Sequence, residues 1–172
     1  MLAHPETHSL RVDQKVEPLY SHVAKVARSL VKAPPNVTID ECMVRFQGRS
    51  AETTRIKGKP TPEGFRINAL GHRGYLFAWV THAVTPGGPP PVPPVAELTL
   101  NESEIVWLLQ QISPMPRPNS LQPLTVFLDR GFTSPRLVAY LRAQNIGVAG
   151  TAKRSFIPPQ LKAAVTTSSP FN

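Results

Sequence analysis

The sequence predicts an α/β fold in which helices flank one mixed sheet of five strands. One observation is a run of apolar and β-branched residues at 125–128, which suits a strand buried on both faces. A second is the helix start that follows at once, with Pro135 in the first turn. The third is the order of the remaining patterns, in which three strands come before these elements. A chain of 172 residues is long enough for one such domain with a core.

Each element is indicated by the period of its apolar residues and by the residues that stop it. Apolar residues at three- and four-residue steps indicate helices, while β-branched and aromatic runs indicate strands. Pro34 and Pro35 end the first helix, and Gly71 to Gly74 turn the chain between two hairpin strands. The expected elements are, in order, a helix over 17–31, strands over 36–46, 65–70 and 75–82, a helix over 99–112, a strand over 125–128, a helix over 135–144 and a strand over 146–149.

The domain boundaries follow from composition. Residues 1–16 are polar without a clear period and predict a flexible tail, and residues 162–172 predict a frayed end. The domain is expected over 17–161, with a polar, basic connection over 51–63. Six of the nine residues at 86–94 are proline, which favours a stiff polyproline II excursion on the surface. The alternative for that stretch is a ligand for a polyproline-binding partner.

The charge of the chain favours a polyanionic partner. Its formal net charge is +8, with seven Arg or Lys against two Glu over 45–73, and five against no acid over 131–172. Such a field attracts nucleic acid, although a generic basic surface gives the same count. No apolar run is long enough for a transmembrane helix, and the acids in the first 20 residues argue against a secretory signal. The single cysteine, Cys42, fits a reducing compartment.

Two aspartates are candidates for a divalent-metal site. Asp129 ends the strand at 125–128, and Asp40 follows β-branched residues in the strand at 36–46. A lone carboxylate at the end of a buried strand is costly unless a metal or a partner compensates. The alternative for Asp129 is a residue that only starts the turn before the next helix. The order of elements matches a ribonuclease H-like sheet, in which the first and fourth strands are neighbours, so Asp40 and Asp129 would face each other.

A set of short motifs in compatible order resembles the PiggyBac-type transposases. The resemblance runs from about Glu17 to Leu161, and each motif is weak when taken alone. The motifs are Thr38-Ile39-Asp40-Glu41, Phe46-x-Gly48-Arg49-Ser50, Lys59-Pro60, Gly64, Gly74-Tyr75, Asp129-x-x-Phe132-Thr133-Ser134, Leu137, Leu141-Arg142 and Ile146-Gly147-Val148-Ala149-Gly150-Thr151.

The resemblance implies a ribonuclease H-like core of the DDE transposase superfamily and a nuclear location. It implies that Asp40 and Asp129 are the first and second of three catalytic aspartates, which hold Mg²⁺ or Mn²⁺ for DNA cleavage and strand transfer. The third aspartate belongs beyond the last strand, yet no Asp or Glu follows Asp129 in this sequence. Arg130 also stands where the family usually has Asn. We therefore expect a domain that is incomplete at its C-terminal end and catalytically inactive.

Three further expectations concern partners. The first is weak, electrostatic DNA binding by a transposase-derived remnant. The residues expected to contact phosphates are Arg49, Arg55, Lys57, Lys59, Lys153 and Arg154. The second is a nuclease whose third metal ligand comes from another chain, and the third is an interaction module that uses the proline-rich stretch. Self-association through an exposed sheet or helix surface is expected if the sheet lacks later helices to cover it.

Overall fold

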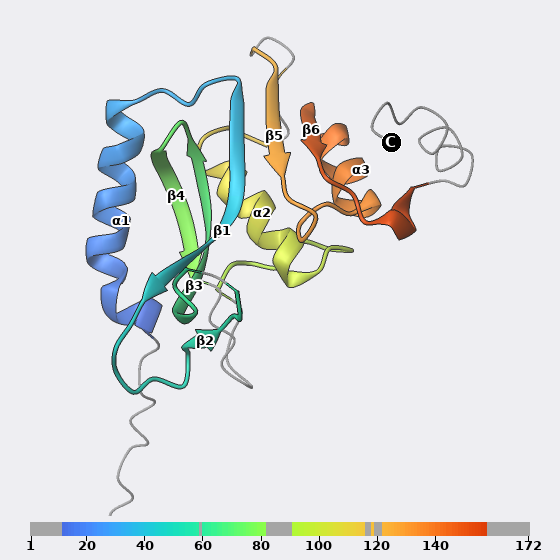
Figure 1. Cartoon of the computed structure of the whole chain (residues 1–172). Coiled ribbons are helices and arrows are strands. Elements are labelled where there is room, and N and C mark those ends of the chain that lie inside the picture. Colours follow the sequence, from blue (N-terminus) through green and yellow to red (C-terminus); the bar gives the residue numbers. More distant parts are fainter. Residues whose placement is uncertain (1–11, 59, 82–90, 116–117, 119–121, 158–172) are drawn as a thin grey trace, which may run out of the picture.

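The computed structural model describes residues 12–58, 60–81, 91–115, 118 and 122–157 (Figure 1). Three helices and six strands form a mixed α/β layer structure, so the expected fold class is confirmed. The elements are α1 (Val12–Leu30), β1 (Asn36–Arg45), β2 (Thr54–Arg55), β3 (Glu63–His72), β4 (Tyr75–Thr81), α2 (Leu100–Gln110), β5 (Leu124–Leu128), α3 (Pro135–Ala143), β6 (Ile146–Gly150) and the short 3-10 turn η1 (Arg154–Phe156).

The sheet has the strand order β2-β3-β1-β5-β6, and β4 pairs with β3. β3 is antiparallel to both β1 and β4, whereas β1, β5 and β6 run parallel to one another. The expected pairing of the first long strand, β1, with the strand at 124–128, β5, is therefore confirmed. Because β1, β5 and β6 are parallel neighbours in that order, they run in the same direction and β5 lies between the other two (Figure 1).

Three local details differ from the sequence expectation. The stretch expected as a plain connection contains β2, which is only two residues long and too short to show a period of its own. The β3–β4 turn is Arg73-Gly74, with φ of 46° and 81°, so the hairpin loop is two residues rather than four. Helix α1 begins at Val12, so residues 12–16 of the expected tail are helical. Pro18 lies inside that helix although proline favours a first turn, which explains why the sequence suggests a later start.

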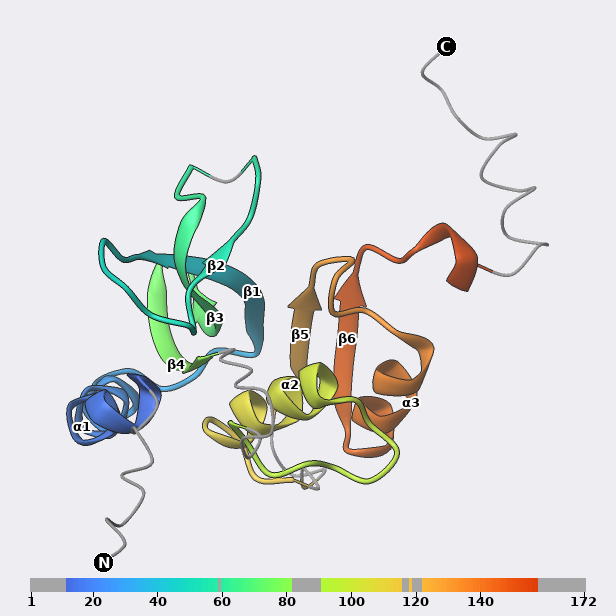
Figure 2. The same ribbon diagram turned by 90° about the horizontal axis from the view of Figure 1, so that it is seen from below.

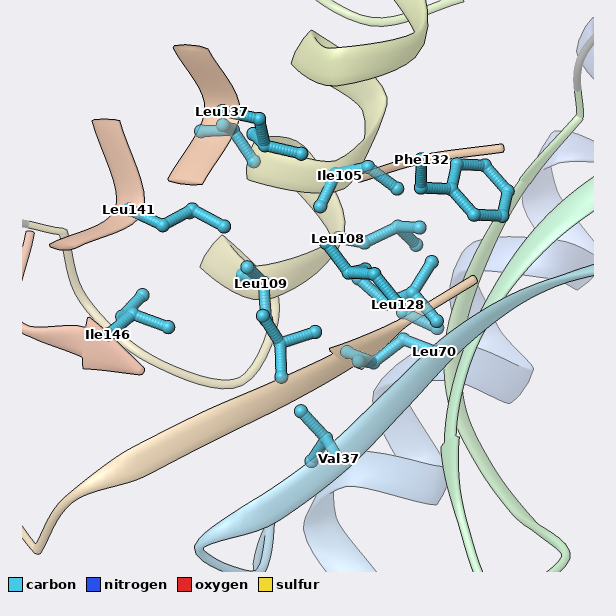
Figure 3. Close-up of a cluster of buried hydrophobic side chains, with 14 of the residues drawn as sticks. Val37, Leu70, Ile105, Leu108, Leu109, Leu128, Phe132, Leu137, Leu141 and Ile146 are labelled. Atoms are coloured by element: carbon cyan, nitrogen blue, oxygen red, sulfur yellow. The ribbon is translucent and has the colours of Figure 1, made fainter. Parts of the chain in front are cut away.

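One hydrophobic core lies between the sheet and helices α2 and α3. Residues of β1 alternate, with Val37 and Ile39 exposed by only 1% and 0%, while Thr38 and Asp40 are exposed. Figure 3 shows side chains of both helices pointing toward those of β1, β3 and β5. The opposite face of the sheet carries exposed residues such as Phe127 on β5. The core therefore fixes which face of β1 and β5 is available to ligands.

Helix α1 packs against β4 at one side of the molecule (Figure 1). The Tyr20 hydroxyl donates to the Trp79 carbonyl over 2.6 Å, and the Tyr75 hydroxyl donates to the Ala27 carbonyl over 2.7 Å. These two bonds attach the helix to the strand at both ends of their contact. A span that could cross a membrane is found in none of the described helices.

Some sequence expectations fall outside the described residues. These are residues 1–11 of the tail, Lys59, residues 86–90 of the proline-rich stretch, and the C-terminal part of the chain from residue 158, including the expected frayed end.

Candidate functional site

The structure brings Asp40 and Asp129 together on one face of the sheet. In the parallel ladder Ile39 is the partner of Leu128, so the next residue of each strand is an aspartate. Since Ile39 and Leu128 point into the core, both aspartates point away from it. They line a single cavity of about 220 Å³. The two acids that the sequence singles out therefore share one site, whose other lining residues are Glu41, Arg66, Gly131 and Phe132.

The two aspartates are held differently. Asp40 lies in the middle of β1, which continues to Arg45. Its Oδ1 accepts a hydrogen bond from the amide of the next residue, Glu41, at 2.7 Å. Asp129 follows the last residue of β5, and its Oδ1 accepts from the Arg130 amide at 2.6 Å and from the Thr151 hydroxyl at 3.0 Å. The Asp129 carboxylate is thus fixed by two donors on one oxygen.

The backbone of Asp129 starts a turn, as the alternative interpretation of this residue expects. Its carbonyl accepts from the amides of Phe132 at 2.9 Å and Thr133 at 3.1 Å. Ser134 then caps α3, because its Oγ accepts from the Leu137 amide. The two interpretations are compatible, since the backbone makes the turn while the side chain lines the cavity.

Thr151 is a site residue to which the sequence analysis gives no role. It directly follows β6, the strand that pairs with β5 through Leu128 and Gly150. Three neighbouring parallel strands therefore present Asp40, Asp129 and Thr151 at adjacent positions. Parallel pairing of the last two strands, together with their register, is the signal that could have indicated it. Gly150 has no room for a side chain, because an added Cβ would lie 2.2 Å from the Leu128 carbonyl oxygen.

An ion pair forms another wall of the cavity. Arg66 on β3 lies 2.9 Å from Glu41 on β1, measured from Nε to Oε2. The cation that lines the cavity is therefore Arg66 and not Arg130, whose side chain is exposed and whose amide is the group that contacts Asp129. Because Arg66 is paired with Glu41, it offsets the charge of the two aspartates only in part.

The carboxylates of this site are the type of ligand that a divalent cation binds, but there are fewer of them than such a cation usually needs. Carboxylate oxygens are the hard ligands that Mg²⁺ and Mn²⁺ prefer, and Asp40 and Asp129 supply them from adjacent strands. In the described part of the chain, no group of three or more His, Cys, Asp or Glu side chains is placed to hold a metal. A bound cation would supply charge stabilisation and a more acidic water at this position.

The basic residues expected to contact DNA form two separate groups. Arg49, Arg55 and Lys57 lie on and around β2, and Lys153 and Arg154 lie at η1; all five are exposed. Figure 2 shows β2 and the red η1 turn on opposite sides of β1 and β5. The Lys153 Nζ lies 5.8 Å from the centre of the Phe156 ring, a weak cation–π contact that leaves the charge at the surface. The acidic pair therefore lies between two basic flanks.

This strand order, with antiparallel strands on one side of β1 and parallel strands on the other, defines a ribonuclease H-like domain. A family model described as Transposase IS4 matches residues 3–171, so the chain belongs to this transposase family. The resemblance to PiggyBac-type transposases is confirmed at the level of family and fold.

A solved structure supports the fold independently. The chain is similar to the cryo-EM structure of a piggyBac transposase synaptic complex with hairpin DNA, with a TM-score of 0.66 and 20% sequence identity. The match covers 91% of this chain and 30% of that one. No curated protein matches the chain.

Proposed function

We propose that this chain is a transposase-derived DNA-binding domain that keeps two of the three acids of a phosphoryl-transfer site and does not cleave DNA by itself. The observation that supports the proposal is the shared cavity of Asp40 and Asp129, in which the other lining acid, Glu41, is paired with Arg66. Among the described residues, no group of three or more His, Cys, Asp or Glu side chains is placed to hold a metal. Two-metal strand cleavage needs carboxylates on both metals, and two residues do not supply them.

DNA binding is the positive half of the proposal. The two basic flanks would contact phosphates, with Arg49, Arg55 and Lys57 on one side and Lys153 and Arg154 on the other. Contacts of this kind are independent of sequence and release counterions, so about three to five of them should cost on the order of 10²-fold in affinity between 50 and 200 mM salt. Such a partner would place the chain in the nucleus, which imaging of a tagged chain tests.

Fluorescence anisotropy with a labelled 20-base-pair duplex measures this binding. We expect a steep salt dependence and equal affinity for unrelated sequences. The double variant Arg55→Gln/Lys57→Gln should weaken binding and reduce the salt slope by about two. A matched control is Lys15→Gln/Lys25→Gln, which also removes two charges, because both lysines are exposed on α1 and neither is part of either flank. Equal retention of the duplex at low and high salt would contradict the proposal.

The second part of the proposal is that the chain does not cleave DNA. Supercoiled plasmid incubated with pure chain and Mg²⁺ or Mn²⁺ should remain supercoiled. Nicking that disappears in Asp40→Ala would overturn this half and favour the second candidate, a metal-dependent nuclease whose third ligand comes from another chain. The specific observation behind that candidate is the open position of the two aspartates on an exposed sheet face. Nicking that persists in Asp40→Ala would indicate a contaminating nuclease.

Self-association is also part of the proposal. Helix α1 exposes five aliphatic side chains at three- and four-residue steps, namely Val16, Leu19, Val23, Val26 and Leu30. Such a stripe is a typical surface for helix pairing. Sedimentation at rising protein concentration should show a mass increase that Leu19→Lys removes, and a constant monomer mass would count against it.

A further inference from the structure

A second cavity, unrelated to the aspartates, lies between α1, β4 and α2. Its volume is about 170 Å³, and apolar surface predominates in its lining. Both tryptophans of the chain line it, Trp79 from β4 and Trp107 from α2, together with Tyr20 of α1. Three aromatic side chains from three elements therefore converge on one groove, although none of them belongs to the site described above.

The aromatic wall of this groove is firmly held. The rings of Tyr20 and Trp79 meet edge to face with their centroids 4.2 Å apart, and the Tyr20 hydroxyl donates to the Trp79 carbonyl. Trp107 lies on α2, whose amino-terminal end is closed by a capping box between Thr99 and Glu102. The groove is thus pre-formed, so a ligand would not have to order it.

The polar edges of the two tryptophans are unused. Within the residues that the structure describes, neither the Trp79 nor the Trp107 indole N–H has a hydrogen-bond acceptor. An indole N–H usually finds an acceptor when it is buried, and both side chains are half-buried at the groove. Two indole donors beside apolar ring faces suit a ligand that offers carbonyl oxygens and apolar rings together.

We propose that this groove binds a proline-rich segment of another protein in the polyproline II conformation. Such a segment has no internal hydrogen bonds, so its carbonyls are free to accept from indole N–H groups, and its rings pack on aromatic faces. Pro91 of the chain itself lines the groove together with the two tryptophans. Glu17 at the rim favours a ligand with Lys or Arg beside its prolines.

The two tryptophans are built-in reporters, because the chain has no others. A titration of the ¹⁵N-labelled chain with a ten-residue proline-rich peptide ending in Arg should shift both indole N–H signals saturably, and a Gly-Ser peptide of equal length should not. Trp107→Phe keeps a ring but removes a donor, so it should weaken binding about three- to tenfold, the effect of one hydrogen bond. Arg142→Gln, on the exposed side of α3, serves as the matched control and should bind like the wild type.

The outcomes separate the alternatives. Replacing the peptide's Arg by Gln should weaken binding to the wild type about twofold and leave binding to Glu17→Gln unchanged. Indole signals that stay fixed at millimolar peptide, or that respond equally to the Gly-Ser peptide, would overturn the proposal. A thermal melt of each variant distinguishes lost binding from lost folding.

Discussion

Two pairs of acids in this chain have opposite surroundings. Asp40 and Asp129 are exposed at the ends of paired strand segments, while Glu102 and Glu104 on α2 are exposed by only 5% and 0%. Burial of a carboxylate is unfavourable unless hydrogen bonds compensate, so the two buried acids need partners and the exposed ones do not. The difference indicates that the glutamates stabilise the fold and that the aspartates remain available to a ligand.

Glu102 shows how complete the compensation is. Its Oε2 accepts from the Thr99 amide at 2.7 Å and from Arg136 at 2.8 Å, and its Oε1 accepts from the Ser134 hydroxyl at 2.6 Å. Thr99 and Ser134 are the residues that cap α2 and α3. One carboxylate therefore joins the amino-terminal ends of both helices that cover the core.

Glu104 is compensated through the sheet. Its Oε2 accepts from the side-chain amide of Asn68 on β3, a residue that is also fully buried. The Asn68 Oδ1 has no hydrogen-bond partner among the described residues, which is a cost that the Glu104 bond offsets only in part. This pair links α2 to the middle of the sheet and explains why a helix with so many apolar residues carries a buried acid.

The largest expected effect is that of removing Glu102. Glu102→Ala leaves Ser134 and Arg136 without their acceptor and opens the capping box, so we expect a loss of about 2–4 kcal/mol in the free energy of unfolding. Urea denaturation measures it. Glu102→Gln keeps an acceptor oxygen and should lose less, about 1–2 kcal/mol. A Glu102→Ala chain as stable as the wild type would remove the structural role that the comparison assigns.

The pH dependence of stability should have the same origin. Burial by itself raises the pKa of Glu102. The hydrogen bonds from Ser134, Thr99 and Arg136 lower it by more in total, so the pKa lies below the usual glutamate value. A carboxyl whose folded pKa is lowered stabilises the fold above its unfolded pKa of about 4.3 and loses that contribution as the pH falls further. Urea midpoints measured from pH 6 to pH 3 should therefore fall less steeply in Glu102→Gln than in the wild type.

The exposed aspartates should behave in the reverse way. Asp129→Asn and Asp40→Asn should leave the free energy of unfolding within about 0.5 kcal/mol, as is usual for exposed positions. If the proposed pair holds a cation, each should weaken Mn²⁺ binding, followed by electron paramagnetic resonance, by on the order of 10²-fold, because each removes one of the two carboxylates that would ligate it. Equal Mn²⁺ binding by wild type and both variants would show that the cation is held elsewhere.

The sequence was sufficient to predict the features that depend on the spacing of apolar residues and on the order of helices and strands. Strand and helix patterns predicted the pairing of β1 with β5 and the shared position of Asp40 and Asp129, since parallel neighbours end on the same side of a sheet. Strand β2 was missed because two residues show no alternation. The groove at Trp79 and Trp107 was missed because these residues are 28 positions apart and meet only when α2 packs on β4, with α1 adding the third wall.

The role of Glu102 was also beyond the sequence analysis. Its position near the start of α2 indicates a helix-dipole contact, which local reasoning captures. The bonds to Ser134 and Arg136 join positions 32 and 34 residues away, and they depend on how α2 and α3 lie over the sheet. Hydrogen bonds between side chains of different helices form only when the fold brings those helices together. The spacing of apolar residues along one helix therefore does not reveal them.

The smallest expected effect concerns Thr151, which shares features of both pairs. Its hydroxyl donates to Asp129 Oδ1 at 3.0 Å, so an exposed carboxylate is oriented by a neighbouring strand. Thr151→Val keeps the shape but removes the donor, and we expect Mn²⁺ affinity to fall about tenfold, the lower end for a residue that orients a ligand. Thr151→Ser keeps the hydroxyl and should bind like the wild type. If Asp129→Asn abolishes Mn²⁺ binding while Thr151→Val leaves it intact, the cation site stands, and the bond from the Arg130 amide, together with the turn that fixes the Asp129 backbone, is enough to hold the carboxylate in place.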